Sequence, residues 1–165
     1  MKAIGYKQAG ALNRTEALVD IELDKPTPTG HDILVKVSAI SVNPVDYKIR
    51  KNVSPTDGAW KVLGWDAVGN VEAVGDNASA FKAGDEVFYA GSLIRQGANS
   101  EYHLVDERIV GRKPKSISDT EAAALPLTAI TAWEMMFDRL DIRKPVPGAA
   151  NAIVIIGGAG GVGSI

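Results

Sequence analysis

The sequence predicts a mainly β protein of the α+β class, in which a small barrel is followed by the start of an α/β domain. Three observations support this prediction. Short alternating strands separated by glycine turns fill roughly residues 1–115, which is typical of a small barrel or sandwich. A helix-capping sequence begins at Ser118. Finally, the β-branched run from Ile153 to Ile156 leads directly into a glycine turn, as at a buried strand of a parallel sheet.

The barrel strands are predicted from alternation between apolar and polar residues. Val19, Ile21 and Leu23, for example, alternate with acidic residues, which indicates a strand with one buried face. Glycine- and proline-rich turns separate the apolar runs. We therefore expect strands at about 2–7, 17–24, 33–42, 62–74, 86–90 and 101–105.

A short helix is predicted directly after the third strand. Asn43 is suited to the N-cap, Pro44 to the first helical position and Asp46 to the third. Asp46 and Arg50 stand four residues apart, a spacing that stabilises one or two helical turns.

The composition changes at Ser118. Ser118-Asp-Thr-Glu121 is a capping box that opens an alanine-rich helix, and Pro126 interrupts it. A second helix is expected to run to about Leu140, with an apolar stripe formed by Leu127, Ile130, Trp133, Phe137 and Leu140.

The glycine turn near the end of the sequence has the spacing G-x-G-x-x-G, formed by Gly158, Gly160 and Gly163. In a dinucleotide fold the first glycine permits a tight turn, the second lets the backbone approach a pyrophosphate, and the third lets a helix pack closely. That helix would direct its free N–H groups at the anion. A simple turn between two strands is the alternative.

Composition limits the possible functions. The 165 residues contain no cysteine, which excludes disulfides and zinc sites built on thiolates. The net charge of −2 gives no indication of nucleic-acid binding. No apolar run approaches the length of a membrane helix, and the N-terminus does not resemble a signal peptide, so a cytoplasmic protein without a membrane partner is expected.

Taken together, several motifs resemble one family. They are Gly64-Trp65-Asp66, Lys82-Ala-Gly-Asp85, Leu125-Pro-Leu-Thr128 with Thr131, and the glycine run 157–163. In this order they resemble the N-terminal half of a medium-chain dehydrogenase/reductase, most closely the zinc-independent quinone oxidoreductase branch that includes zeta-crystallin. The resemblance implies a chaperonin-10 (GroES)-like catalytic domain at 1–125. Residues 126–165 would then be a linking helix, the first strand and the glycine loop of a truncated Rossmann domain.

The resemblance also implies that no zinc is bound. Zinc-dependent members carry a cysteine before the short helix and a Gly-His-Glu motif, where this sequence has Asn43 and Gly64-Trp65-Asp66. An amide replaces the thiolate and an indole replaces the imidazole. Catalytic zinc normally needs three protein ligands, and two of the expected set are absent.

The resemblance assigns candidate site residues. Asn43, Asp46, Tyr47 and Trp65 would form the catalytic side; capping of the helix is the alternative for Asn43 and Asp46, an exposed tyrosine for Tyr47, and a core tryptophan for Trp65. Thr128 and Thr131 would lie near a nicotinamide, unless their hydroxyls bond their own backbone. The cofactor phosphates would contact Gly158, Gly160, Gly161, Val162 and Gly163.

By this resemblance the parent protein is an NADPH-dependent, metal-independent oxidoreductase that transfers hydride to a quinone or an α,β-unsaturated carbonyl, with NADH not excluded. We expect the 165-residue chain itself to be inactive. The alternatives are a zinc-type alcohol dehydrogenase with unusual ligands and a non-catalytic GroES-like domain fragment. Exposed strand edges near Ile153 to Ile156 favour a homodimer.

Overall fold

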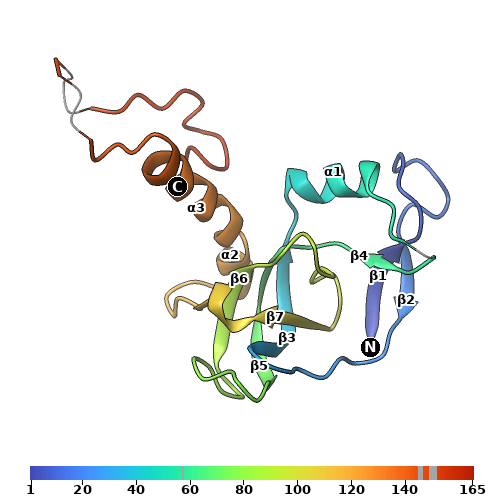
Figure 1. The fold of residues 1–165 in the computed structure, drawn as a ribbon. Helices are drawn as coiled ribbons and strands as arrows, with labels where there is room; N and C mark the ends of the chain where they lie inside the picture. The colour runs from blue at the N-terminus through green and yellow to red at the C-terminus, as the bar shows by residue number, and fades with distance from the viewer. Residues whose placement is uncertain (57, 145–146, 149–151) are drawn as a thin grey trace.

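The computed structural model describes residues 1–56, 58–144, 147–148 and 152–165. It confirms a mainly β fold with few helices (Figure 1). The strands are β1 (Lys2–Tyr6), β2 (Val19–Glu22), β3 (Asp32–Ser41), β4 (Lys61–Val62), β5 (Asp66–Val74), β6 (Glu86–Ala90), β7 (Tyr102–Asp106) and β8 (Val110–Arg112). The helices are α1 (Pro44–Asn52), α2 (Asp119–Ala123) and α3 (Pro126–Trp133), with a 3-10 turn η1 (Glu107–Ile109) and a π-helical segment η2 (Glu134–Arg139).

Two antiparallel sheets form the barrel-like body. The larger sheet has the order β7-β3-β5-β6-β8 and the smaller one the order β2-β1-β4. The long pairing of β3 with β5 contains two register irregularities, which bend these strands. The main core lies on the inner face of the larger sheet, where alternate apolar residues such as Ile33, Val35 and Val87 are fully buried.

The predicted strand 62–74 is divided in two. Lys61–Val62 belongs to the smaller sheet, whereas Asp66–Val74 belongs to the larger one. Gly64 lies in the connection with φ +97°, a left-handed conformation that favours glycine. The chain therefore changes sheets here, and this change brings Trp65 and Asp66 to the end of β5 that faces α1 and α3.

The predicted helices after Ser118 are confirmed. Ser118 and Glu121 form the capping box of α2, and Pro126 begins α3 after a break. The second helix continues to Arg139, but its last part is π-helical, so the regular apolar stripe is lost. Trp133 and Leu140, expected on that stripe, are 61% and 67% exposed.

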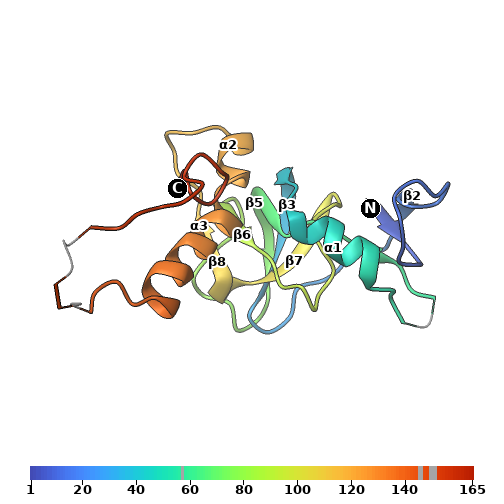
Figure 2. The same cartoon turned by 90° about the horizontal axis from the view of Figure 1, so that it is seen from above.

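The expectation of a buried strand at Ile153–Ile156 is wrong for this structure. No strand is assigned there, and Val154 and Ile156 are 88% and 96% exposed. A buried parallel strand requires paired neighbours, and every pairing in the described sheets is antiparallel. Both views show residues 152–165 outside the two sheets, with the C-terminus on the side of the molecule that carries α3 (Figures 1 and 2).

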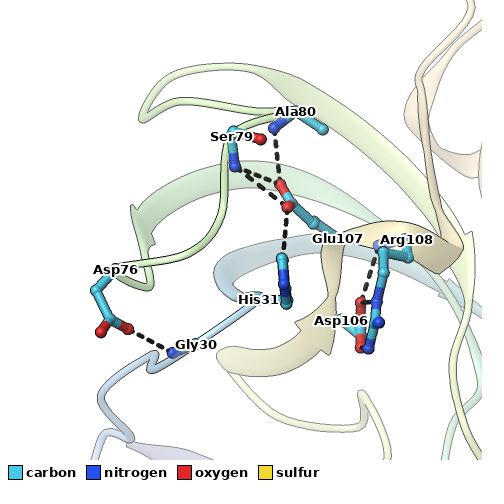
Figure 3. Close-up of polar contacts among 8 residues, drawn as sticks. All are labelled: Gly30, His31, Asp76, Ser79, Ala80, Asp106, Glu107 and Arg108. Carbon is cyan, nitrogen blue, oxygen red and sulfur yellow. Dashed lines mark hydrogen bonds and ion pairs between the residues drawn. The ribbon is translucent and has the colours of Figure 1, made fainter.

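Three loops are joined at η1 by a buried carboxylate, which we call the Glu107 clasp (Figure 3). The Glu107 carboxylate accepts the backbone N–H groups of Ser79 and Ala80, at 2.9 and 2.8 Å, and the ring of His31 lies 3.2 Å away. The N–H of Ala80, supported by His31 and Ser79, holds the pKa of Glu107 below its usual range. The clasp fixes the turn that carries Ile109.

His103 is buried in β7, and both of its ring nitrogens have hydrogen-bond partners. Its Nε2 lies 2.9 Å from the Gln96 carbonyl, which can only accept, so Nε2 carries the proton. Nδ1 therefore accepts the Tyr89 hydroxyl at 3.0 Å. Burial lowers the pKa of His103 to about 4.

Candidate active site

An apolar cavity of about 430 Å³ lies between the barrel and α3. Its walls come from the start of α1, the residue that precedes β5, the end of β6 with the loop after it, η1 and α3. They include Val45, Trp65, Leu93, Ile109, Leu127 and Thr131. Four other cavities of the described chain are lined by none of the predicted catalytic residues or threonines. This cavity is therefore the candidate active site.

Trp65 gives the cavity its shape. The side chain is fully buried in a cluster with Tyr6 and Leu63, against which the half-buried Val45 and Leu127 pack. Its indole Nε1 donates to the Ser92 carbonyl at 3.0 Å, which fixes the ring plane and the loop after β6 together. A rigid indole in an apolar wall is suited to contact with a flat ligand.

A network of three polar side chains lies directly behind this cavity. Asp46 accepts the N–H groups of Asn43 and Gly64, at 2.8 and 2.9 Å. Asp66 accepts the Asn43 side-chain amide at 2.8 Å and the Leu127 N–H at 2.9 Å. We call Asn43, Asp46 and Asp66 the backing network, because Asp46 follows Val45, Asp66 follows Trp65 and accepts from Leu127, and Asn43 is hydrogen-bonded to both aspartates.

The backing network carries two carboxylates and no cation. Asp66 is fully buried, and none of the ion pairs of the described residues involves it. Burial raises the pKa of Asp66; the hydrogen bonds from Asn43 and Leu127 lower it in part, and nearby Asp46 raises it further. A buried carboxylate with only neutral donors is unfavourable, so a structural or functional reason must retain it.

The predicted catalytic residues occupy three different environments. Trp65 lines the cavity, whereas Asn43 and Asp46 lie behind it, with both Asp46 oxygens bonded to backbone N–H groups. Tyr47 is 51% exposed, and its ring lies 5.9 Å from the Lys51 ammonium.

The two predicted threonines also separate. Thr131 borders the cavity, and its hydroxyl donates to the Leu127 carbonyl at 2.7 Å. Thr128 is not among the lining residues, and its hydroxyl lies 3.0 Å from the carbonyls of Ala124 and Leu125. In this structure both hydroxyls bond their own helix, which is the alternative that the sequence left open.

The glycine loop is compact and lies apart from the cavity. A Cβ on Gly163 would lie 2.7 Å from the Gly158 Cα, and a Cβ on Gly160 would lie 3.2 Å from the Gly157 carbonyl oxygen. The N–H of Gly160 donates to the same carbonyl at 2.9 Å. The fold of the loop thus requires glycine at position 163, because the backbone there passes close to Gly158. Such a close backbone approach suits a phosphate-binding turn.

The residues at the family's zinc positions do not fit zinc. Trp65 offers only an indole N–H, which is a donor and cannot ligate a metal. The oxygens of Asp66 already accept two hydrogen bonds, one of them from the amide that replaces the thiolate. Within the described residues, no group of three or more His, Asp or Glu side chains is gathered as a metal site.

Sequence reasoning missed Asp66 and the wall residue Ile109. Asp66 stood beside Trp65 in a recognised motif, but its partner Leu127 is 61 residues away. Ile109 comes from a turn that carries no motif. Of these, only Asp66 had a sequence signal, namely an acidic residue inside an apolar strand.

None of the described helices is long and apolar enough to cross a membrane.

The fold and site define a class: a GroES-like barrel with a linking helix that closes an apolar cavity. The family model for the alcohol dehydrogenase GroES-like domain matches residues 29–115, more than half of the chain. The chain therefore belongs to this family, within the medium-chain dehydrogenase/reductase superfamily.

Relatives with known names agree on the superfamily and differ in their chemistry. A zinc-type alcohol dehydrogenase-like protein from Staphylococcus epidermidis is 47% identical over all of this chain and 49% of its own length. A solved Rhizobium etli CFN 42 protein, named as a candidate zinc-dependent alcohol dehydrogenase, is 65% identical with a TM-score of 0.96, over 100% of this chain and 48% of that one.

A third relative is the Escherichia coli quinone oxidoreductase, solved in complex with NADPH. It is 30% identical with a TM-score of 0.73, over 85% of this chain and 41% of that chain. The present chain thus spans about half the length of the relatives that it matches.

Proposed function

We propose that this chain contributes the substrate side of a metal-independent, NADPH-dependent oxidoreductase that reduces a quinone or an α,β-unsaturated carbonyl compound. The observation that carries the proposal is Trp65. A buried indole stands where a metal-binding imidazole is expected, and it forms a wall of an apolar cavity. The likeness to a quinone oxidoreductase solved with NADPH supports the same substrate and cofactor class.

Each group of residues would have its own role in binding cofactor or substrate. NADPH, when bound, supplies hydride; the loop residues Gly158, Gly160, Gly161, Val162 and Gly163 would hold its pyrophosphate, with NADH as the open alternative. Thr131, at the cavity border, and Thr128, one turn earlier, would position the nicotinamide end. Trp65 would orient a flat substrate and exclude water.

A proton must accompany hydride transfer. We propose the Tyr47 phenol as its donor, because it is half exposed at the helix that borders the cavity and can exchange with solvent. Asn43 and Asp46 would then act by holding that helix rather than by touching the substrate, since their polar atoms are already engaged.

The test is oxidation of NADPH by a protein of family length that contains this chain. With 1,4-naphthoquinone as acceptor, we expect turnover that survives dialysis against EDTA, and no stoichiometric metal by elemental analysis. Replacement of Tyr47 by phenylalanine should lower turnover and spare NADPH binding. Activity abolished by EDTA and restored by zinc would reject the proposal.

The second candidate is a zinc-type alcohol dehydrogenase with unusual ligands, favoured by the names of the staphylococcal and rhizobial relatives. It predicts alcohol oxidation with stoichiometric zinc. If neither activity is found and NADPH does not bind, a non-catalytic GroES-like domain becomes the better interpretation.

Three further properties belong to this proposal. We expect a cytoplasmic homodimer. The 165-residue chain alone should not turn over, because its glycine loop is not joined to any strand of the described structure and so offers little preorganised cofactor site. Saturable NADPH binding by this chain at micromolar concentration would contradict that expectation.

A further inference from the structure

The start of α3 lacks a cap of its own. Leu125 occupies the N-cap position, and an apolar side chain cannot accept a hydrogen bond from the first turn. Pro126 at the next position has no N–H to satisfy, so the first unpaired donor is the N–H of Leu127. That donor points to the Asp66 carboxylate, 2.9 Å away, at the start of β5.

Asp66 therefore caps a helix that begins about sixty residues later in the chain. Its other oxygen accepts the side-chain amide of Asn43, the N-cap residue of α1, at 2.8 Å. One buried carboxylate thus joins the starts of two helices to one strand. A negative charge at a helix N-terminus is also favoured by the helix dipole, which offsets part of the unfavourable burial.

The neighbours of Asp66 form the cavity walls. Trp65 directly precedes it, Leu127 is bonded to it, and Val45 lies between Asn43 and Asp46 of the backing network. Val45 and Leu127 both pack against the cluster of Tyr6, Leu63 and Trp65, and both line the same cavity as Trp65. The hydrogen bonds of Asp66 therefore join residues that lie beside these walls.

We infer that Asp66 is a positioning residue of the substrate site: by capping α3 from the barrel, it fixes the width of the slot between Trp65 and Leu127. This inference rests on the proposed function, since it assigns the slot to a flat ligand. Asp66 itself does not touch that ligand, and it acts through Leu127 and Asn43.

The chain offers a matched set of variants. In Asp66→Asn only one acceptor oxygen remains, which can serve the Asn43 amide or the Leu127 N–H but not both, so one of the two bonds is lost. The double variant Asn43→Asp with Asp66→Asn reverses donor and acceptor, and it restores the bond with the same total charge. Asp at position 43 also remains a good N-cap residue.

The measurements use the 165-residue chain in a Trp60→Phe, Trp133→Phe background, so that Trp65 is its single tryptophan. Quenching of Trp65 emission by 1,4-naphthoquinone gives a Kd, and hydrogen exchange gives the protection of the Leu127 amide. Both are measured well below the melting temperature of every variant. For Asp66→Asn we expect a Kd about tenfold weaker, a shifted Trp65 emission and faster Leu127 exchange, all restored by the swapped double variant.

The outcomes separate this inference from the proposed function. A lower melting temperature for Asp66→Asn, with unchanged Kd, Trp65 emission and Leu127 exchange, would overturn the positioning role and leave only a structural one. Failure of the double variant to restore these signals would overturn it as well. If the parent chain does not bind naphthoquinone, yet the emission and exchange change and recover as expected, the positioning role holds and the proposed substrate class is rejected.

Discussion

Asp66 and Glu107 are two buried carboxylates that perform the same task in opposite surroundings. Each accepts a backbone N–H from a distant segment. Glu107 also faces His31, and its pKa is lowered, whereas Asp66 has only neutral donors and an acidic neighbour, and its pKa is raised. The Glu107 clasp is thus an ordinary structural tie, while the backing network retains a charge in an unfavourable place beside the candidate site.

The largest expected effect comes from breaking the turn that serves the backing network. Gly64→Ala should lower the free energy of unfolding by about 4 kcal/mol, because it combines a left-handed backbone conformation with overpacking. A Cβ there would meet the side chain of Asn99. Urea denaturation measures the loss.

Gly84→Ala is the matched control for this variant. Gly84 has a similar φ of +91°, but a Cβ at this residue would have nothing within 4 Å of it. Only the conformational strain applies, so we expect a loss of about 1 kcal/mol. Equal losses for the two alanine variants would show that the close packing around Gly64 contributes nothing.

The next effect comes from His103, whose pKa is lowered by burial. His103 has a folded-state pKa of about 4 against 6.5 in a free side chain, so the unfolded chain binds its proton first. The contribution of His103 to the free energy of unfolding is therefore complete above pH 6.5. It falls as the pH drops, by about 3 kcal/mol between pH 7 and 4. His103→Gln, which keeps one donor and one acceptor, should remove this slope from the pH profile of unfolding.

The contributions of the two carboxylates to the free energy of unfolding should depend on pH in opposite directions. Both changes should be smaller than that expected for His103. For Glu107 the lowered pKa gives a stabilisation that is complete above about pH 4.5 and is lost as the pH falls. For Asp66 the raised pKa gives a contribution present below about pH 3.8 and lost as the pH rises through the folded-state pKa. Its carboxylate faces Asp46 from α1 and the Asn43 and Leu127 donors, with no cation among its described contacts.

The measurement is the difference in unfolding free energy between the parent chain and each amide variant. Parent minus Glu107→Gln should grow from pH 3 to 7, and parent minus Asp66→Asn should shrink over the same range. If the two differences run in parallel, the contrast drawn between the sites is wrong.

The smallest effect on stability is expected outside the barrel. Val154→Lys with Ile156→Lys should change the free energy of unfolding by less than about 0.5 kcal/mol, because both side chains are almost fully exposed. The same change should convert the expected dimer to a monomer in sedimentation, since exposed β-branched segments favour pairing between chains. A parent chain that is already monomeric would contradict the expected dimer.

The barrel was largely predictable because its signals are local. Alternation located the strands, Asn43 and Ser118 identified helix starts, and Pro126 identified a break. The strand at Ile153–Ile156 was predicted wrongly because an apolar β-branched run records a preference, whereas a strand requires hydrogen-bonded neighbours.

The site was only partly predictable, for a related reason. Trp65 and Thr131 were found by position in motifs, and they do meet at one cavity. Asp66 acquires its role from Leu127, and Ile109 acquires its role from the Glu107 clasp through a turn. Such roles depend on long-range contacts that no spacing in the sequence encodes.

The capping of α3 from β5 also determines where the molecule can bend. If α3 moved away from the barrel, its first turn would lose its cap, and the buried Asp66 carboxylate would lose a hydrogen-bond donor. We therefore expect α3 and the barrel to move as one rigid body. The following segment Glu134–Arg139 is π-helical, with wider and weaker turns. We therefore expect motion between the barrel and the segment after Arg139 to be concentrated in those six residues, which would leave the slot beside Trp65 undisturbed.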